Sequence, residues 1–102
     1  MLNINEDVLY LQTDGGGRLL FHTFDKEYRA LQGVEDWANY LHHRGFHRID
    51  RGTIVNLRKI EVFDQELRVL ILNTFDGAVS LPIAESMIKV LHEELRIMGW
   101  KR

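Results

Sequence analysis

The stretch FHRIDRGTIVNLRKI, residues 46–60, carries both the strand pattern that decides the fold class and the densest positive charge of the chain. Between positions 42 and 59, one acidic residue, Asp50, stands among five basic ones: Arg44, Arg48, Arg51, Arg58 and Lys59. The segment therefore has a net charge of +4, although the whole chain has a formal net charge of −2. Because the local field steers a polyanion more than the mean charge does, this pattern indicates a directed basic face and makes nucleic acid its candidate partner.

Two strands joined by a turn are predicted inside this stretch. Residues 46–49 begin and end with an apolar side chain, residues 53–55 are β-branched, and Asp50-Arg51-Gly52 between them has the composition of a turn. Asn56 is expected to bond to backbone groups and fix the turn that follows. Outward from this stretch, further strands are predicted at 8–11, 19–24, 27–31, 60–63, 67–72 and 78–81. The short turns between them favour antiparallel pairing.

Two helices are predicted from the spacing of apolar residues. Four of them recur at i, i+3, i+4 and i+7 and would line one face of a helix: Val34, Trp37, Ala38 and Leu41. A second stripe with helical period runs to Gly99: Ala84, Met87, Ile88, Leu91, Leu95 and Met98. We therefore expect a mainly β or α+β fold with antiparallel sheets and two helices.

Size and composition indicate one soluble domain over residues 1–102. The 102 residues suffice for a single core, and 45% hydrophobic with 27% charged residues is ordinary for a globular protein. There are no cysteines, which excludes disulfides and thiolate metal sites. The start of the chain lacks the basic and apolar regions of a signal peptide, and no run approaches about 18 apolar residues. We therefore expect a cytoplasmic location and no membrane partner.

The sequence contains no pattern typical of an enzyme, a metal site or a cofactor site. His42 and His43 are neighbours on a predicted helix and point in different directions, so metal ligation is not expected. Residues 15–17 are glycines, but they lack the strand–loop–helix context and the Lys-Ser/Thr of a phosphate-binding P-loop. We expect no catalysis, no cofactor and no small-molecule substrate.

Three short motifs follow one another in a characteristic order: EDVLYL at 6–11, FHRIDRGTIVNL at 46–57 and LPI at 81–83. Together they resemble the LytTR-type DNA-binding domain family over about residues 4–96. The core signature of that family is a Phe, an Arg two positions on, His-Arg-Ser, an aromatic residue and Ile/Val-Val-Asn-Leu. The corresponding residues of this chain are Phe46, Arg48, Asp50-Arg51-Gly52, Thr53 and residues 54–57.

The resemblance implies a bacterial transcription regulator with elongated, mostly antiparallel sheets that binds double-stranded DNA through loops. By position, three loops would face the duplex: residues 14–18, 50–52 and 84–86. No phosphate-receiving receiver domain fits in the chain, so a stand-alone version is expected. The family also implies a homodimer on a repeated site.

The candidate DNA-contacting residues combine these loops with the basic stretch. They are Gly16, Gly17, Arg18, Arg48, Arg51, Gly52, Arg58, Lys59, Ser86 and Lys89. Arg51 is the leading candidate, because a turn projects its guanidinium toward a phosphate or a guanine edge; a surface ion pair is the alternative. Arg48 either makes such a contact or holds the turn at Asp50 in place. Arg58 and Lys59 either position the protein on phosphates or form a solvated face.

Three departures from the family pattern keep a second function open. The first loop offers only glycines before Arg18, Asp50 stands where the family has His, and Glu85 stands where an Arg is typical. Phosphate would repel both carboxylates unless neighbouring arginines neutralise them. The alternative function is a LytTR-fold protein-interaction module with weak or no DNA binding. It would pair with itself or with another regulator through a sheet edge or the surface around Trp100.

Overall fold

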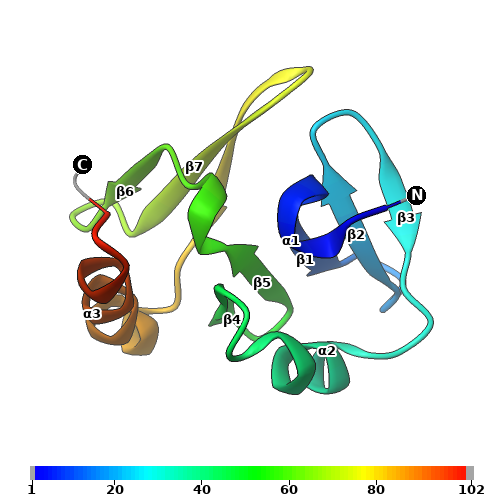
Figure 1. Ribbon diagram of the computed structural model, residues 1–102, viewed down its shortest axis with the longest axis horizontal. Coiled ribbons are helices and arrows are strands. Elements are labelled where there is room, and N and C mark those ends of the chain that lie inside the picture. Colours follow the sequence, from blue (N-terminus) through cyan, green and yellow to red (C-terminus); the bar gives the residue numbers. More distant parts are fainter. Residues whose placement is uncertain (1, 101–102) are drawn as a thin grey trace.

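Two antiparallel sheets and three α-helices make up residues 2–100 of the structure, a computed structural model (Figure 1). Met1 and residues 101–102 lie outside the described residues. Along the chain, the elements are α1 (Ile4–Asp7), β1 (Val8–Thr13), β2 (Leu19–Thr23), β3 (Glu27–Arg29), α2 (Val34–Leu41), β4 (Phe46–Asp50), β5 (Thr53–Asn56), the 3-10 helix η1 (Leu57–Lys59), β6 (Val62–Asp64), β7 (Val69–Thr74), β8 (Gly77–Pro82), the 3-10 helix η2 (Glu85–Met87) and α3 (Ile88–Met98). The predicted fold class, mainly β with antiparallel sheets, is confirmed.

The strands form a five-stranded sheet of order β3-β2-β1-β5-β4 and a three-stranded sheet of order β6-β7-β8. The centre of the larger sheet joins segments far apart in the sequence, because Tyr10 pairs with Val55 and Leu11 with Ile54. Every strand pairing within residues 2–100 is antiparallel, as the short turns predicted. Which strands belong to which sheet was not predicted, because turn composition indicates which sequence neighbours pair but not which distant strands do.

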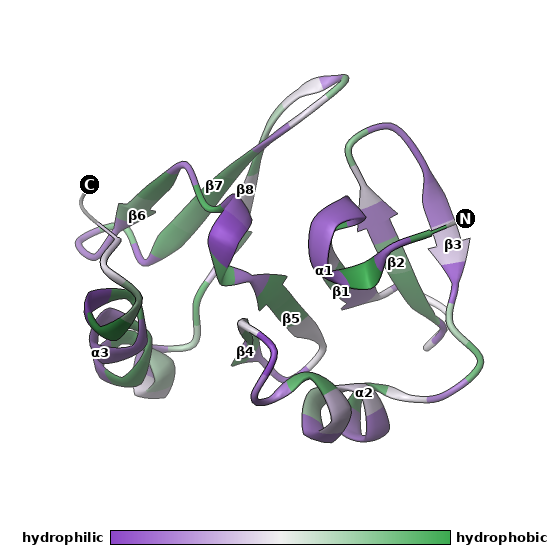
Figure 2. Cartoon of the chain, in the orientation of Figure 1, coloured by the Kyte–Doolittle hydropathy of each residue, from purple (hydrophilic) through white to green (hydrophobic). Residues whose placement is uncertain are grey.

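Both faces of the central strands β1 and β5 are buried. One face of the five-stranded sheet packs against α2 through Val8, Leu11, Leu19, Phe21, Ala30, Leu41, Phe46 and Ile54. The other packs against the three-stranded sheet and α3, in a second core that includes Tyr10, Ile49, Val55, Leu70, Leu72, Leu81, Leu91 and Leu95. Figure 2 shows β5 and β7 as hydrophobic ribbons and β3 as a hydrophilic one. The molecule measures 32 × 27 × 25 Å, so its elongation is slight.

A β-bulge lets β1 serve both cores. Strict alternation would put Val8 and Tyr10 on one face of the sheet. The register with β2 shifts between these two residues, however. Val8 and Leu11 consequently pack on the α2 side, whereas Leu9 and Tyr10 join the core on the α3 side. The run Val8–Leu11 is therefore apolar throughout, as a strand buried on both faces requires.

The two predicted helices are confirmed, with one boundary moved. The apolar stripe of α2 packs on the sheet as its spacing predicted. The α3 helix begins at Ile88, because residues 85–87 form η2, and it ends at Met98, followed by Gly99 with φ 84°. The short helix α1 was not predicted, since four residues are too few to show a helical period. The Asn3 side chain, which accepts a hydrogen bond from the N–H of Glu6 at 3.1 Å, caps this helix.

Trp100 covers the edge of a core. Its side chain is half-buried and packs against the core on the α3 side. The indole Nε1 donates a hydrogen bond to the carbonyl of Ile60 at 3.4 Å, and the ring lies 6.4 Å from that of Phe63. Trp100 therefore does not present a largely exposed side chain to a partner.

Asn56 ties the N-terminal helix to the end of β5. Its side chain is fully buried, and its Nδ2 donates to the carbonyls of Asn5 at 2.9 Å and Val8 at 2.8 Å. Its Oδ1 accepts a hydrogen bond from the N–H of Arg58 at 3.2 Å. All three partners are backbone groups, so the predicted structural role of Asn56 is confirmed.

We predict that Asn56→Ala lowers the free energy of unfolding by about 1–3 kcal/mol, because it leaves two carbonyls and one N–H without their partner. Chemical denaturation measures this change. Asn39→Ala, at an exposed position of α2, is the matched control and should stay within about 0.5 kcal/mol of the wild type. Equal stabilities of the two variants would contradict the role assigned to Asn56.

Candidate nucleic-acid interface

The three loops that the resemblance implies lie together at one end of the five-stranded sheet. β1 and β5 are antiparallel neighbours, so the loop after β1 lies beside the turn before β5. The N–H of Thr13 donates to the carbonyl of Gly52 at 2.9 Å, and the N–H of Ala84 donates to the carbonyl of Ile49 at 2.8 Å. Backbone hydrogen bonds thus join all three loops. We call the surface formed by residues 14–18, 50–52 and 84–86 the loop end.

Asp14 shapes the first loop. Its carboxylate accepts hydrogen bonds from the backbone N–H groups of Gly16 at 2.8 Å and Arg18 at 2.9 Å, and from Nε of Arg18 at 3.1 Å. These donors, first among them the backbone N–H of Arg18, hold the pKa of Asp14 below its ordinary value of 3.8. Gly17 has φ 83°, a conformation that favours glycine. The two candidate glycines are exposed at the tip, and the Arg18 side chain is 58% exposed.

Arg48 holds the second turn from within. Its Nε donates to the carbonyl of Asp50 at 3.1 Å, and its Nη2 donates to the carbonyl of Arg51. Its Nη1 binds both carboxylate oxygens of Glu35, at 2.6 and 2.8 Å. Because every nitrogen of the guanidinium has a partner, the geometry favours the holding role over a direct contact with DNA.

Arg51 is presented by the turn that Arg48 holds. It is exposed, and none of the residues 2–100 accepts a hydrogen bond from its guanidinium. The carboxylate of Asp50 accepts the N–H of Gly52 at 2.9 Å, so it serves the turn itself. A Cβ on Gly52 would lie 3.1 Å from Oγ1 of Thr13, so glycine permits the close approach of the turn to β1.

The third loop carries a carboxylate that is already paired. Oε2 of Glu85 lies 3.3 Å from Nη1 of Arg68, while Ser86 and Lys89 are exposed. The carbonyl of Arg68 accepts the N–H of Ile83 at 2.9 Å, which fixes the β6–β7 hairpin beside this loop. Sequence reasoning missed Arg68, because its neighbour Glu85 is distant in the chain and no local pattern joins the two.

Arg29 is a second basic residue that sequence reasoning missed. It ends the edge strand β3 opposite Leu20, and the following N–H, from Ala30, donates to the carbonyl of Leu19 at 2.9 Å. This pairing brings Arg29 next to the first loop. It is exposed along with the rest of β3. The pairing of β3 with β2 would have been the signal. The position of Arg29 depends on the register of that pairing, however, and the structure supplies the register.

Charge at and beside the loop end is therefore positive. The exposed basic residues there are Arg18, Arg29, Arg51, Arg68 and Lys89. Of the three carboxylates on the loop end, those of Asp14 and Glu85 are paired with arginines, and that of Asp50 accepts a backbone N–H. These contacts offset the phosphate repulsion that the isolated carboxylates would cause.

Arg58 and Lys59 lie away from the loop end. They follow β5, whereas the turn that presents Arg51 precedes it, and four strand residues span roughly 13 Å. Nη1 of Arg58 donates to the carbonyl of Arg44 at 2.9 Å. A Cβ on Gly45 would overlap this guanidinium, so the glycine makes room for it. The fold thus divides the basic stretch between two opposite ends of the sheet.

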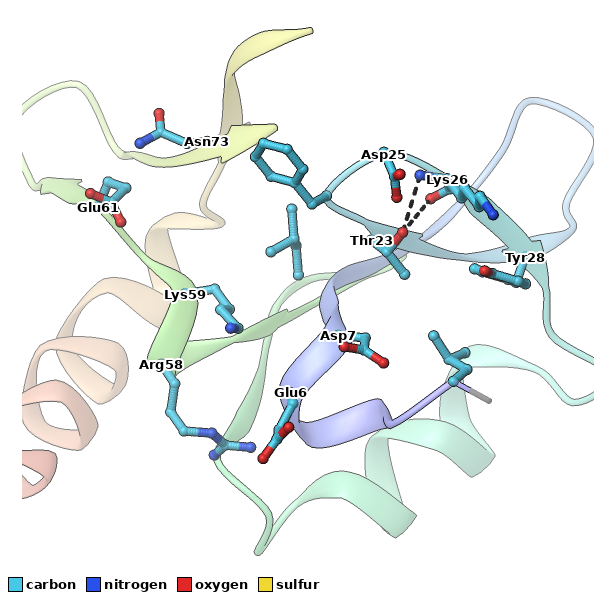
Figure 3. Close-up of a pocket in the computed structure, with 13 residues that line it drawn as sticks. Glu6, Asp7, Thr23, Asp25, Lys26, Tyr28, Arg58, Lys59, Glu61 and Asn73 are labelled. Carbon is cyan, nitrogen blue, oxygen red and sulfur yellow. Dashed lines mark hydrogen bonds between the residues drawn. The ribbon is translucent and has the colours of Figure 1, made fainter. Parts of the chain in front are cut away.

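An open groove of ≈ 900 Å³ lies at the opposite end, where side chains from α1, the β2–β3 turn and η1 face one another (Figure 3). Its charged lining consists of Glu6, Asp7, Asp25, Lys26, Arg58, Lys59 and Glu61. With four carboxylates against three basic groups, this lining does not favour a polyanion. At its rim, the rings of Phe24 and Phe75 pack edge to face with centroids 6.3 Å apart, and they are 53% and 73% exposed.

A protein-family model described as the LytTr DNA-binding domain matches residues 1–96. The chain belongs to the LytTR family. A solved structure of a LytTr DNA-binding domain from Bacillus cereus superposes on the chain with a TM-score of 0.74. The two are 17% identical, and the match covers 89% of this chain and 83% of that one. This likeness shows that the fold is that of a LytTr domain.

The family membership supplies DNA as the class of partner. A comparison with curated protein sequences finds no match. Within residues 2–100, no helix is both long and apolar enough to span a membrane. The same residues contain no group of three or more His, Asp or Glu side chains arranged to hold a metal ion.

The first loop of this LytTR domain should respond to pH through Asp14. Because the pKa of Asp14 is lowered in the folded chain, the ionised carboxylate stabilises the loop above its unfolded pKa, and this contribution is lost as the pH falls through the folded pKa. We predict that the amide proton signals of Gly16 and Arg18 titrate together with a midpoint below 3.8. NMR spectra recorded over a pH series measure the midpoint. Asp14→Asn should abolish this titration, and a wild-type midpoint at or above 3.8 would contradict the proposed loop geometry.

Proposed function

We propose that this LytTR domain binds double-stranded DNA in a sequence-specific manner through the loop end and acts as a bacterial transcription regulator. The observation that carries the proposal is the position of Arg51. It is exposed, its guanidinium has no hydrogen-bond partner among residues 2–100, and it lies on the middle one of three loops that backbone hydrogen bonds hold together. Its fork of donors suits both a phosphate and the O6 and N7 atoms of guanine.

The remaining candidates of the loop end divide into two kinds of contact. Arg18 and Lys89 have exposed charges suited to phosphates, which position a protein on DNA without reading its sequence. Gly16 and Gly17 have no side chains to prevent close approach of the backbone, and Ser86 offers a hydroxyl. Arg48 contributes indirectly, because it holds the turn that presents Arg51.

Further parts of the proposal rest on the family. The protein would act in the bacterial cytoplasm, as a homodimer on a repeated site, and without a catalytic reaction, a cofactor or a small-molecule substrate. Arg58 and Lys59 would have structural and solvated roles, because the fold places them away from the loop end.

A second candidate function, a protein-interaction module with weak or no DNA binding, is favoured by the aromatic pair Phe24 and Phe75. Both rings are largely exposed at the end opposite to the loop end. Exposed aromatic groups beside a groove are typical of protein contacts, and binding through them would change little with salt.

The test begins with selection of bound fragments from a random pool of DNA, followed by titration of the enriched fragment at about 50 and 200 mM salt. If the protein makes about four phosphate contacts, its affinity should fall on the order of a hundredfold when the salt concentration rises from the lower to the higher value. We predict that Arg51→Ala weakens binding severalfold or more and lowers the salt slope by about 0.9 if it contacts phosphate, or relaxes one base preference if it contacts guanine.

Arg44→Ala is the matched control for Arg51→Ala. It removes the same charge from an exposed position before β4, at the other end of the strand pair. Its guanidinium packs over the ring of Tyr40 and not at the loop end. Equal losses from Arg44→Ala and Arg51→Ala would mean that only total charge matters. Absence of binding by the wild type near 50 mM salt would refute the proposed function and favour the protein-interaction module.

A further inference from the structure

Arg68 has an unusual backbone conformation. Among residues 2–100 it is the only residue other than glycine with a positive φ, 56°. A side chain in this left-handed region costs about 1 kcal/mol relative to glycine, and hairpins commonly place glycine there. Two hydrogen bonds fix the hairpin around it: Ile83 N–H to the Arg68 carbonyl at 2.9 Å, and Leu67 N–H to Oδ1 of Asp64 at 2.9 Å. A residue other than glycine in this conformation is a reason to ask what its side chain does.

The Arg68 side chain reaches the third loop of the loop end. Its Nη1 lies 3.3 Å from Oε2 of Glu85, and the two side chains are 51% and 85% exposed. No hydrogen bond within residues 2–100 engages Nε or Nη2 of Arg68, or Oε1 of Glu85. At this exposure the ion pair stabilises the fold very little. Both groups are therefore available to a ligand while they remain in contact with each other.

In the major groove, the amino groups of cytosine and adenine can donate a hydrogen bond to a carboxylate on a DNA-binding surface, and the pairing of Glu or Asp with cytosine is the usual one. Phosphate, by contrast, repels a carboxylate. The repulsion is reduced where an arginine neutralises the carboxylate, as Arg68 does for Glu85. The free guanidinium nitrogens of Arg68 can at the same time donate to a phosphate oxygen next to that base.

We propose that Glu85 and Arg68 form a base-reading pair, in which Oε1 of Glu85 accepts a hydrogen bond from a cytosine amino group and Arg68 neutralises the carboxylate and binds the adjacent phosphate. The inference rests on the proposed function and deepens it, because it assigns a preferred base to the third loop. A carboxylate on this loop is then a determinant of specificity and not a defect of the binding surface.

The test uses the full chain and the DNA fragment enriched by selection, with each base pair replaced in turn. For Glu85→Ala, we predict that the preference for cytosine at one position falls by about fivefold or more, while the preferences at other positions are unchanged. For Arg68→Gly, we predict weaker binding to every fragment and a salt slope smaller by about 0.9. Glycine adopts φ 56° readily, so Arg68→Gly should melt at the same or a higher temperature than the wild type.

The chain provides a matched control in the pair Glu93 and Arg96 on α3. These residues form the same kind of exposed ion pair, with side chains 53% and 65% exposed. They lie in the later turns of a helix whose start is next to the third loop, roughly 8–12 Å further along its axis. Glu93→Ala and Arg96→Ala should leave both the base preferences and the salt slope as in the wild type.

Two results would overturn the inference, and they separate it from the proposed function. If the wild type binds DNA and Arg51→Ala weakens it, but Glu85→Ala keeps every base preference, the base-reading pair is wrong and DNA binding stands. If the wild type enriches no fragment and does not bind near 50 mM salt, both are wrong. Loss of the cytosine preference in Glu85→Ala together with a smaller slope in Arg68→Gly supports the pair.

Discussion

The pairing of β1 with β5 is the constraint on which the rest of the structure depends. It is held at one end by the hydrogen bond from Thr13 to Gly52 and at the other by the buried Asn56, which donates to the carbonyl of Val8. Both faces of this strand pair are buried, so a slip by one residue would exchange Ile54 and Val55 between two different cores. The register is therefore determined strongly. The same register sets the first two loops side by side, which makes the loop end a consequence of core packing.

Charge in this molecule is organised by the fold more than by the sequence. The basic stretch from 42 to 59 looks continuous in the chain, yet β4 and β5 carry its members to opposite ends of the sheet. Arg51 reaches the loop end, while Arg58 is bound to backbone carbonyls beside the groove. Arg29 and Arg68, which belong to distant segments of the chain, lie beside the loop end. The basic residues at and beside the loop end are consequently not the same set as the basic residues of the segment 42–59.

The acidic residues of the loop end illustrate why local charge is a poor guide to binding. Considered singly, Asp14, Asp50 and Glu85 would each repel phosphate. In the structure, two of them are paired with arginines, and Asp50 accepts a hydrogen bond within its own turn. Carboxylates that order a loop make its arginines better positioned, because each ordered side chain loses less entropy on binding. This LytTR domain differs at most positions from a solved relative, as the 17% identity indicates, and has the same fold.

The sequence by itself determined the strands of the central motif, the apolar stripes of α2 and α3, the antiparallel turns, the structural role of Asn56 and the family. These features depend on local periodicity, on turn chemistry and on motifs, all of which are written within short segments. It could not show α1, whose single turn has no period, nor the bulge in β1 or which strands belong to which sheet. Only the tertiary structure decided that Arg48 holds its turn, that Arg58 lies away from the loops and that Arg68 meets Glu85. Each of these depends on which distant segments pack together, and that is set by burial of the two cores, an energy summed over the whole chain and not readable at any one position.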